Sequence, residues 1–418
     1  MKTFPHRQTV LALAAAAASV LSATSAQAVD WGGYFRTGPG ATSKDSSRAC
    51  YGLGGEGMKY RLGNECDFYG EFLLSQGFKA DGVEYKAALM TNLYSNGTDT
   101  GAVDRGLSGQ PATNQSLDHS KLGINQMYVE GKGYDIAPNT NFWIGKRFYG
   151  RADVHIVDTF FVNLSGVGAG ADSMDVGGGK LAIAAFRSDS ADSTKPGSRV
   201  NVDFSELVVN PGGKLRIVGT ITKGDFTDGK NGFGLTAQHN QDNALGLGGT
   251  NILWVQYAQG SAGLNGNFGN LGANSGNKSY RIVESPGWQV GPFGGQGMVM
   301  FQHDKLDDGL GNTTNVKSVS VGGRGSYALT KNFKLVAEAA YVQKKPDDSD
   351  TQKLAKFTFA PTLATGPGFW NRPELRLYVT TAKWNNAANA ASGANGLTGN
   401  ADGKTKGTSY GAQAEIWF

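Results

Sequence analysis

The sequence predicts an all-β protein, a closed antiparallel β-barrel that spans a membrane. Three observations predict it: an N-terminal export signal, segments in which apolar and polar residues alternate, and connections that are either short or long. After the signal, no window approaches the roughly 18 consecutive apolar residues of a membrane helix. Because only helices and closed barrels satisfy their backbone hydrogen bonds in lipid, the exported chain is either soluble or a barrel.

Residues 1–28 are predicted to be a cleaved signal peptide. Lys2 and Arg7 supply its positive charge, residues 10–20 form a short apolar run, and a small-x-small cleavage site ends it. An N-terminal membrane anchor is the weaker alternative, because the run is too short to span about 30 Å of hydrocarbon. We therefore expect residues 29–418 to form a single barrel domain.

Apolar and polar residues alternate with a period of two in six segments, each about ten residues long, as expected of tilted membrane strands. The segments are 29–36, 67–75, 83–94, 316–324, 375–381 and 410–418. In the fifth, Leu375, Leu377 and Val379 share one face, which would meet lipid in a barrel.

The connections between these segments are of two kinds. Residues 210–213 and 329–332 are short turns that contain turn-forming residues and little else. The long connections are polar and glycine-rich: 96–120, 189–198, 260–279, 304–315, 346–352 and 385–409. Short turns at one end and long loops at the other are typical of outer-membrane barrels, and a soluble β-sandwich explains them less well. About 20–24 residues per strand and connection give about 16 to 19 strands, enough for an aqueous lumen, and we expect no helix after the signal.

Several functional classes are disfavoured. The near balance of 39 Lys plus Arg against 35 Asp plus Glu argues against a nucleic-acid-binding protein. The two cysteines, Cys50 and Cys66, suit one disulfide in an oxidising compartment and give no support to metal ligation. Asp153 and Asp158 could be the paired carboxylates of a glycosidase, but the adjacent Arg151 would lower their pKa values rather than raise one. We expect no enzyme activity, no metal and no cofactor.

Residues 145–170, GKRFYGRADVHIVDTFFVNLSGVGAG, mix charged and aromatic side chains too densely for a lone strand or an exposed loop. Such a segment fits a place where one side meets protein and the other meets water or a ligand. The glycine run 166–170 at its end is expected to be a turn.

The parity of the alternating segments predicts which side chains face the lumen. These are Tyr34 with Arg36, Tyr69 with Glu71, Trp370 with Arg372, Glu374 and Arg376, and Trp417 with Gln413 and Glu415. Aromatic faces stack on the C–H faces of sugar rings, while arginine and carboxylate groups hydrogen-bond the hydroxyls. The alternative is that the aromatics form an interface girdle, but girdle residues should face lipid.

At this point the residues resemble the maltoporin family of sugar-specific outer-membrane porins. The resemblance runs from Val29 to Phe418 and is densest at VDWGGYFRTG, YRLGNEC, GKRFYGRADVHIVD, WNRPELRLYVTTAKW and GAQAEIWF. It implies an eighteen-stranded barrel that assembles as a homotrimer, with a third loop that folds inward to constrict the pore. Residues 145–170 match that loop.

Carried over position by position, the resemblance implies a row of sugar-stacking aromatics at Tyr34, Tyr69, Trp370 and Trp417. It implies partners for the sugar hydroxyls at Arg36, Arg61, Glu71, Arg151 and Asp158. The constricting tyrosine of the family is Phe160 here, and the family's loop disulfide matches Cys50 with Cys66.

The chain departs from the family pattern at four places that bear on substrate. Residues 96–120 contain no tryptophan to reach into a neighbouring subunit, and one aromatic of the row falls at Leu253, with Trp254 on the other face. Phe160 lacks the hydroxyl of the family's tyrosine, and Asn125 stands where an arginine partner is expected.

The leading hypothesis is an outer-membrane channel for facilitated diffusion of maltose, maltodextrins or related oligosaccharides. Its expected partners are the sugar, outer-membrane lipid and two further copies of the chain. Alternatives are a general porin for small solutes and ions, a porin for another disaccharide such as sucrose, and a secreted β-rich protein that binds or hydrolyses carbohydrate.

Overall fold

The structure, a computed structural model, describes residues 29–43, 49–54, 57–96, 120–188, 194–393, 397–398 and 402–418. The predicted signal peptide and most of the predicted long loop 96–120 lie outside these residues.

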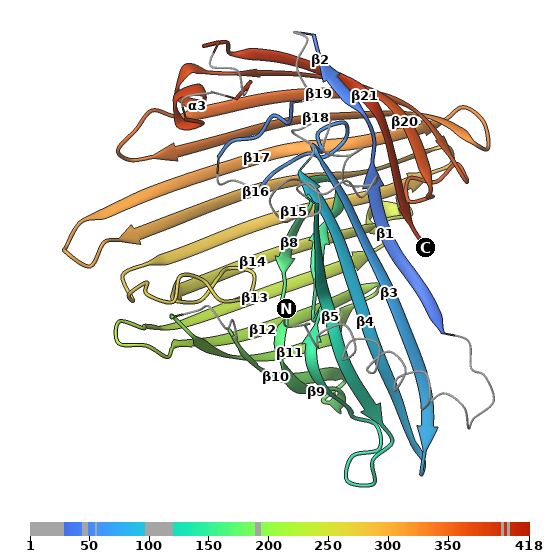
Figure 1. The fold of residues 1–418 in the computed structure, drawn as a ribbon, viewed down its shortest axis with the longest axis vertical. Coiled ribbons are helices and arrows are strands. Elements are labelled where there is room, and N and C mark those ends of the chain that lie inside the picture. Colours follow the sequence, from blue (N-terminus) through green and yellow to red (C-terminus); the bar gives the residue numbers. More distant parts are fainter. Residues whose placement is uncertain are drawn as a thin grey trace, which may run out of the picture.

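The described residues form one closed antiparallel barrel of eighteen wall strands (Figure 1). The sheet contains nineteen strand segments, but β1 (Asp30–Thr37) and β2 (Gly40–Thr42) belong to one wall strand, because both pair with β21 (Lys406–Trp417). β1 also pairs with β3 (Asp67–Ala80), which closes the ring. The eighteen-stranded barrel implied by the family resemblance is confirmed.

The remaining wall strands each pair with their neighbours in the ring. Their bounds are Val83–Asn96 (β4), Ser120–Lys132 (β5), Asn141–Arg147 (β6), Gly166–Val176 (β9), Gly179–Arg187 (β10), Gly197–Asn210 (β11), Gly213–Gly224 (β12), Asn231–Asp242 (β13), Thr250–Gly260 (β14), Lys278–Val290 (β15), Phe293–Asp307 (β16), Thr313–Ala328 (β17), Phe333–Pro346 (β18), Gln352–Ala364 (β19) and Glu374–Trp384 (β20). The other elements are β7 (Ala152–Val154), η1 (His155–Val157), β8 (Thr159–Val162), η2 (Ala244–Gly246) and α3 (Asn386–Ala391).

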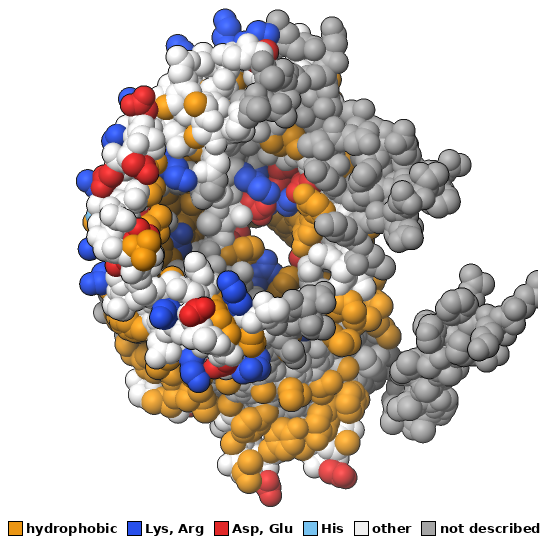
Figure 2. Space-filling model, turned by 60° about the vertical axis from the view of Figure 1, so that its left-hand side comes forward, with side chains coloured by type: hydrophobic (Ala, Val, Ile, Leu, Met, Phe, Trp, Pro, Cys, Tyr) orange, Lys and Arg blue, Asp and Glu red, His pale blue; other side chains and the backbone are white. Residues whose placement is uncertain are grey.

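The predicted alternation is confirmed. Leu375, Leu377 and Val379 of β20 are 57, 64 and 52% exposed, whereas Glu374 and Arg376, which alternate with them, are each 3% exposed. Apolar side chains therefore face outward and charged ones inward, as in a membrane barrel with a polar lumen. Figure 2 shows hydrophobic side chains on the outside and charged side chains around the opening.

The wall strands are more variable in length than the expected ten residues, from 7 in β6 to 16 in β17. The predicted connection 304–315 is wrong for this reason, because β16 and β17 extend through most of it and leave only residues 308–312. The predicted turns 210–213 and 329–332 do join neighbouring strands, at the end opposite the long loops.

Two other expectations are wrong. The glycine run 166–170 is not a turn but the start of strand β9, and its glycines leave room for side chains of the neighbouring strands. A β-carbon at Gly170 would lie 2.9 Å from Nε1 of Trp143, and one at Gly168 would lie 2.9 Å from the ring of Phe186.

The expectation of no helix after the signal is also wrong. The loop between β20 and β21 contains the short helix α3, and the Asn385 side chain at its N-terminus accepts a hydrogen bond from the backbone N–H of Ala388. No helix among the described residues is long and apolar enough to cross a membrane.

Candidate functional site

Among the residues that the structure describes, three connections fold into the lumen, and we name them by their order at the loop end of the barrel. L1 (residues 43–66, described in part) follows β2, L3 (residues 148–165) follows β6, and L6 (residues 261–277) follows β14. β7 and β8 of L3 pair only with each other, separate from the wall. This confirms the prediction that the charged and aromatic stretch 145–170 contains a loop that leaves the wall.

L1 is fixed to the inner wall by hydrogen bonds to side chains of β17, β18 and β19. The backbone N–H of Leu62 donates to Glu338 at 3.0 Å, the Tyr60 hydroxyl lies 2.8 Å from that of Ser320, and Lys356 donates to the Tyr60 carbonyl at 2.5 Å. Tyr60 and Leu62 are 1 and 0% exposed. L1 is therefore part of the packed lining of the lumen.

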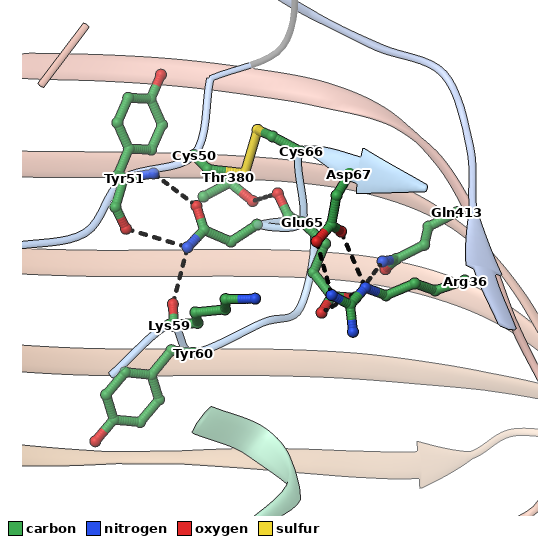
Figure 3. Close-up of a disulfide and its surroundings, with 12 residues drawn as sticks. Arg36, Cys50, Tyr51, Lys59, Tyr60, Glu65, Cys66, Asp67, Thr380 and Gln413 are labelled. Atoms are coloured by element: carbon green, nitrogen blue, oxygen red, sulfur yellow. Dashed lines mark hydrogen bonds and ion pairs between the residues drawn. A yellow bond between two sulfur atoms is a disulfide. The ribbon is translucent and has the colours of Figure 1, made fainter. Parts of the chain in front are cut away.

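The predicted disulfide between Cys50 and Cys66 is present and closes L1 on itself, with a Cα–Cα distance of 5.9 Å (Figure 3). Within the closed segment, Asn64 accepts from the backbone N–H of Tyr51 at 2.8 Å and donates to its carbonyl at 3.1 Å. The disulfide and these bonds hold the start of L1 beside β3.

L3 is held by L6 and by the wall behind it. The Asn163 N–H donates to the Asn265 carbonyl of L6 at 2.8 Å, and Arg199 of β11 donates to the Leu164 carbonyl at 2.7 Å. Gln256 of β14 donates to the Phe161 carbonyl at 2.6 Å. Because these partners are backbone carbonyls, they fix the path of L3 rather than one side chain.

Asp158 joins L3 to L1 and β1 through positive charges. Its carboxylate lies 3.1 Å from the ammonium nitrogen of Lys59, 3.5 Å from Nη1 of Arg36 and 3.6 Å from Nη1 of Arg61. Burial alone would raise the pKa of the Asp158 carboxyl, but the charges of Arg61, Arg36 and Lys59 outweigh burial and hold the pKa below its usual value. The structure thus brings together three of the residues predicted to contact sugar hydroxyls.

The two arginines are also paired with acidic residues of L1 and β3. Arg36 binds Asp67 at 2.8 Å and Glu65 at 3.2 Å (Figure 3), and Arg61 binds Glu65 at 2.9 Å. These contacts form one cluster of three cations and three carboxylates, so their charges largely cancel. Its members are Arg36, Lys59, Arg61, Glu65, Asp67 and Asp158.

The predicted aromatic row lies in two halves. The rings of Tyr34 and Tyr69 are 6.4 Å apart between centroids, and the Tyr34 hydroxyl donates to Glu415 at 3.1 Å. Trp417 lies opposite Tyr34 in the strand register, so the row continues across β21. Trp370, which stands in the turn between β19 and β20, is 48% exposed.

His155 of L3 connects the two tryptophans and was not among the predicted site residues. Its ring packs edge-to-face on Trp370 at 5.4 Å and on Trp417 at 5.7 Å. Burial lowers the pKa of His155 well below its usual value, as do the nearby arginines, while Glu415 at 3.8 Å opposes them. The dense mixture of charge and aromatics in 145–170 was the only signal for this histidine, and by itself it did not single out His155.

Arg151 occupies a different position from the other arginines. Its guanidinium carbon lies 4.0 Å from the ring centroid of Phe148 and 3.9 Å from that of Phe160. Among the described residues, no hydrogen bond or ion pair of this guanidinium is found. Phe160, predicted to constrict the pore, therefore stacks on a cation, and Phe148 was missed as the second ring.

Asn125 enters the lumen at a bulge in β5, where Met90 and Thr91 pair with Gln126 and Ile124 and leave it as the extra residue. Its amide donates to Glu71 at 2.8 Å and to the Tyr69 hydroxyl at 3.1 Å. A neutral amide thus lies against Glu71, and no ion pair of this carboxylate is found in the part of the chain that the structure describes.

At the position of the missing aromatic, Trp254 faces inward but is 0% exposed, because it packs on Phe161 of L3 at 5.3 Å between ring centroids. Leu253 belongs to the opposite face of β14. Neither residue presents a ring to the lumen. No group of His, Cys, Asp or Glu among the described residues could hold a metal ion.

Comparison with known proteins agrees with this architecture. Over 93% of its length the chain is similar to OccAB1 of Acinetobacter baumannii, covering 96% of that chain with a TM-score of 0.52 and 12% identity. It is also similar to OccAB2 of the same organism, with 93 and 98% of the two chains covered, a TM-score of 0.49 and 12% identity. At 12% identity, the likeness to OccAB1 concerns the fold alone.

A match to a protein-family model shows the family of the chain. The model described as LamB porin matches residues 29–418, the whole of the chain after the predicted signal peptide. The closed barrel, its polar lumen and its inward-folded loops agree with that match. The chain therefore belongs to the LamB porin family and is an outer-membrane porin channel rather than an enzyme.

Proposed function

We propose that the channel conducts maltose, maltodextrins or related oligosaccharides by facilitated diffusion. The observation that carries the proposal is the aromatic row of Tyr69, Tyr34, Trp417 and Trp370 along an otherwise polar lumen. A water-filled pore has no hydrophobic reason to display such rings, whereas sugar rings stack on them through their C–H faces.

Charged and amide groups beside the row would exchange hydrogen bonds with sugar hydroxyls as the solute moves. Glu71 and Arg151 are the candidates whose charges are not consumed by an ion pair among the described residues. Weak, repeated binding suits a channel, because tight binding would trap the solute.

Current through single channels in planar bilayers tests the proposal. Maltose, longer maltodextrins and sucrose should each be added, and block that depends on sugar concentration is expected for at least one of them. If none of the sugars blocks the current, the protein is the general small-solute porin instead.

Two tryptophan variants provide the matched comparison. Trp370→Ala should weaken sugar block about fivefold, since one aromatic stacking contact contributes about 1 kcal/mol. Trp31→Ala removes the same side chain from the outer face, where it is 57% exposed, and should leave the block unchanged. An equal loss in both variants would contradict a stacking role for Trp370.

The homotrimer implied by the resemblance is part of the proposal. An apolar hollow on the outer face, lined by Leu74, Leu89, Met127, Val129 and Ile144, is a surface that a second copy would cover. Cross-linking in native membranes tests this: trimers should form with wild-type protein and be reduced by Met127→Lys, whereas monomers alone would contradict it.

A further inference from the structure

Seven consecutive wall strands, β15 to β21, each carry a lysine near the loop end that has the parity of the outer face. They are Lys278, Lys305, Lys317, Lys345, Lys353, Lys383 and Lys406. Six are exposed, and Lys345 is half-buried and donates to the Ser349 carbonyl at 2.9 Å. We call them the outer lysine row.

The strand period places the outer lysine row on the outside of the barrel. Lys383 has the same parity in β20 as Val379, which is 52% exposed, and Lys353 has the same parity in β19 as Phe357, which is 48% exposed. Residues that alternate with these face the lumen and are buried. The ammonium groups therefore point away from the pore.

Neighbouring members of the row oppose one another directly. The strand registers pair Lys278 with Lys305, Lys317 with Lys345, and Lys383 with Lys406. Like charges directly opposite in adjacent strands are destabilising. Among the described residues, no carboxylate lies within ion-pair distance of any of these six lysines. Asp347 is hydrogen-bonded to Asn315, and the charges of Lys317 and Lys345 also help to lower the pKa of its carboxyl.

Several other surface cations of the barrel do have acidic partners. At the turn end, Lys79 lies 3.3 Å from Glu84, and Lys180 and Lys214 each lie 2.5 Å from a carboxylate, those of Asp175 and Glu206. At the loop end of β10 and β12, Arg187 and Lys223 share Asp225. The six lysines of the opposed pairs differ from these cations, because they form no ion pair among the described residues.

The depth of the row can be judged from the exposed aromatic residues on the same strands. They are Tyr280, Phe301, Phe357 and Tyr410, between 38 and 48% exposed. Aromatic girdles mark the edge of the apolar band of a membrane barrel. The lysines lie two to four residues further along their strands, about 7–14 Å at about 3.4 Å per residue, so their ammonium groups reach the depth of lipid headgroups.

We propose that the outer lysine row binds the phosphate groups of anionic lipids in the leaflet at the loop end of the barrel. A phosphate between two opposed ammonium groups would convert their repulsion into attraction, since each ammonium has three donors and binds phosphate as a point charge. The row follows the membrane girdle over seven strands instead of forming a compact patch. This shape matches a lipid surface better than a protein partner with a small acidic patch.

Native mass spectrometry of the detergent-solubilised full-length protein tests the proposal. The probes are diphosphoryl lipid A, dioleoylphosphatidylglycerol and zwitterionic dioleoylphosphatidylcholine, each added alone at several NaCl concentrations. Wild-type protein should retain the two anionic lipids in preference to phosphatidylcholine, and added salt should weaken their retention.

Two charge-removal variants decide the location of the binding. A variant with glutamine at the three opposed pairs, K278Q, K305Q, K317Q, K345Q, K383Q and K406Q, should lose anionic-lipid retention by about fivefold for each lysine removed. A variant with K79Q, K180Q and K214Q, which removes lysines at the turn end, should retain the lipids as wild type does.

The variants must first be shown to be folded, by the resistance of the barrel to unfolding in cold detergent. Sugar block of the current, which depends on the lumen, should be unchanged in both, so this proposal and the proposed sugar transport can fail separately. Equal lipid retention by the six-lysine variant and wild type, equal losses in both variants, or no preference of wild type for anionic lipid would overturn the proposal.

Discussion

Asp158 offers a direct test of how the constriction loop is held, and Asp158→Asn is the matched change. Its backbone φ is 57°, in the left-handed region that asparagine also tolerates, so the substitution preserves shape and backbone and removes only the charge. The variant loses the anion that faces Lys59, Arg36 and Arg61 at 3.1, 3.5 and 3.6 Å.

The structure sets the size of the effect. The contact with Lys59 is a hydrogen bond to a charged group, generally about 1.5–3 kcal/mol, but the Lys59 side chain is 43% exposed and water reduces the value to the lower end. The two arginine contacts at longer distance add about 0.2–1 kcal/mol each. A total of about 2–3 kcal/mol would raise the population of undocked L3 about thirtyfold or more.

Hydrogen exchange measures this population. The backbone N–H groups of Arg61 and Lys59 donate to the Ile156 and Val157 carbonyls of L3 at 2.9 and 3.3 Å, so their exchange should accelerate in Asp158→Asn. Removal of one negative charge should also shift the reversal potential in a salt gradient towards anion selectivity.

Lys59→Gln is the control, since it removes one partner of opposite charge and should shift the selectivity the other way with a smaller change in exchange. Wild-type exchange rates and an unchanged reversal potential in Asp158→Asn would refute the role assigned to this carboxylate.

Three further predictions concern L1, its disulfide and His155. A β-carbon at Gly322 would lie 2.4 Å from a ring carbon of Tyr60 in L1, so Gly322→Ala should destabilise the protein by about 1–3 kcal/mol through overpacking and lower its unfolding temperature. Gly323→Ala is the control, because its nearest contact would be at 3.5 Å and its unfolding temperature should not change. Equal unfolding temperatures of the two variants would contradict the docking of L1. Replacement of Cys50 and Cys66 by serine should leave the barrel folded but raise protease cleavage within L1, since closing a loop of this length contributes about 3 kcal/mol; wild-type cleavage rates would count against it. The pKa of His155 is depressed in the folded protein, whereas an unfolded histidine binds a proton near pH 6.5, so the stability of the protein should fall as pH drops from about 6.5 to 5. In His155→Gln the unfolding temperature should depend less on pH over this range. An unchanged pH dependence of the unfolding temperature would exclude His155 as its cause.

The barrel wall could be predicted from the sequence because each strand carries its own signal. Period-two alternation is local, and Leu375, Leu377 and Val379 identify the outer face of β20 without reference to any other strand. Strand ends were less predictable. β16 and β17 extend through polar residues that resemble a loop, because backbone pairing between strands continues above the apolar band.

Strand parity also predicted which wall side chains face the lumen, but their contacts with L1 and L3 could not be predicted from it. Asp158 meets Lys59 across 99 residues of sequence, and no local pattern encodes that contact. His155 was missed because a single histidine has no periodic signature, and the position of Asn125 depends on a bulge that shifts the parity of β5. The glycine run 166–170 was misread because a strand that passes under large side chains needs small residues as much as a turn does.

The predicted hydroxyl partners also fall into two groups, which differ in whether their side chains are already paired with protein groups. Arg61 directs its donors to Glu65, Tyr34 and Glu415 and lies beside Asp158, so most of its five N–H groups already have protein acceptors. The Arg151 guanidinium lies over the rings of Phe148 and Phe160, and among the described residues it makes no hydrogen bond or ion pair. A ring-stacked guanidinium is oriented without consuming its hydrogen bonds, because the rings occupy its faces and leave its edge open. In the proposed sugar channel, Phe160, which lacks the hydroxyl of the family's tyrosine, contacts an arginine whose N–H groups have no protein acceptor among the described residues.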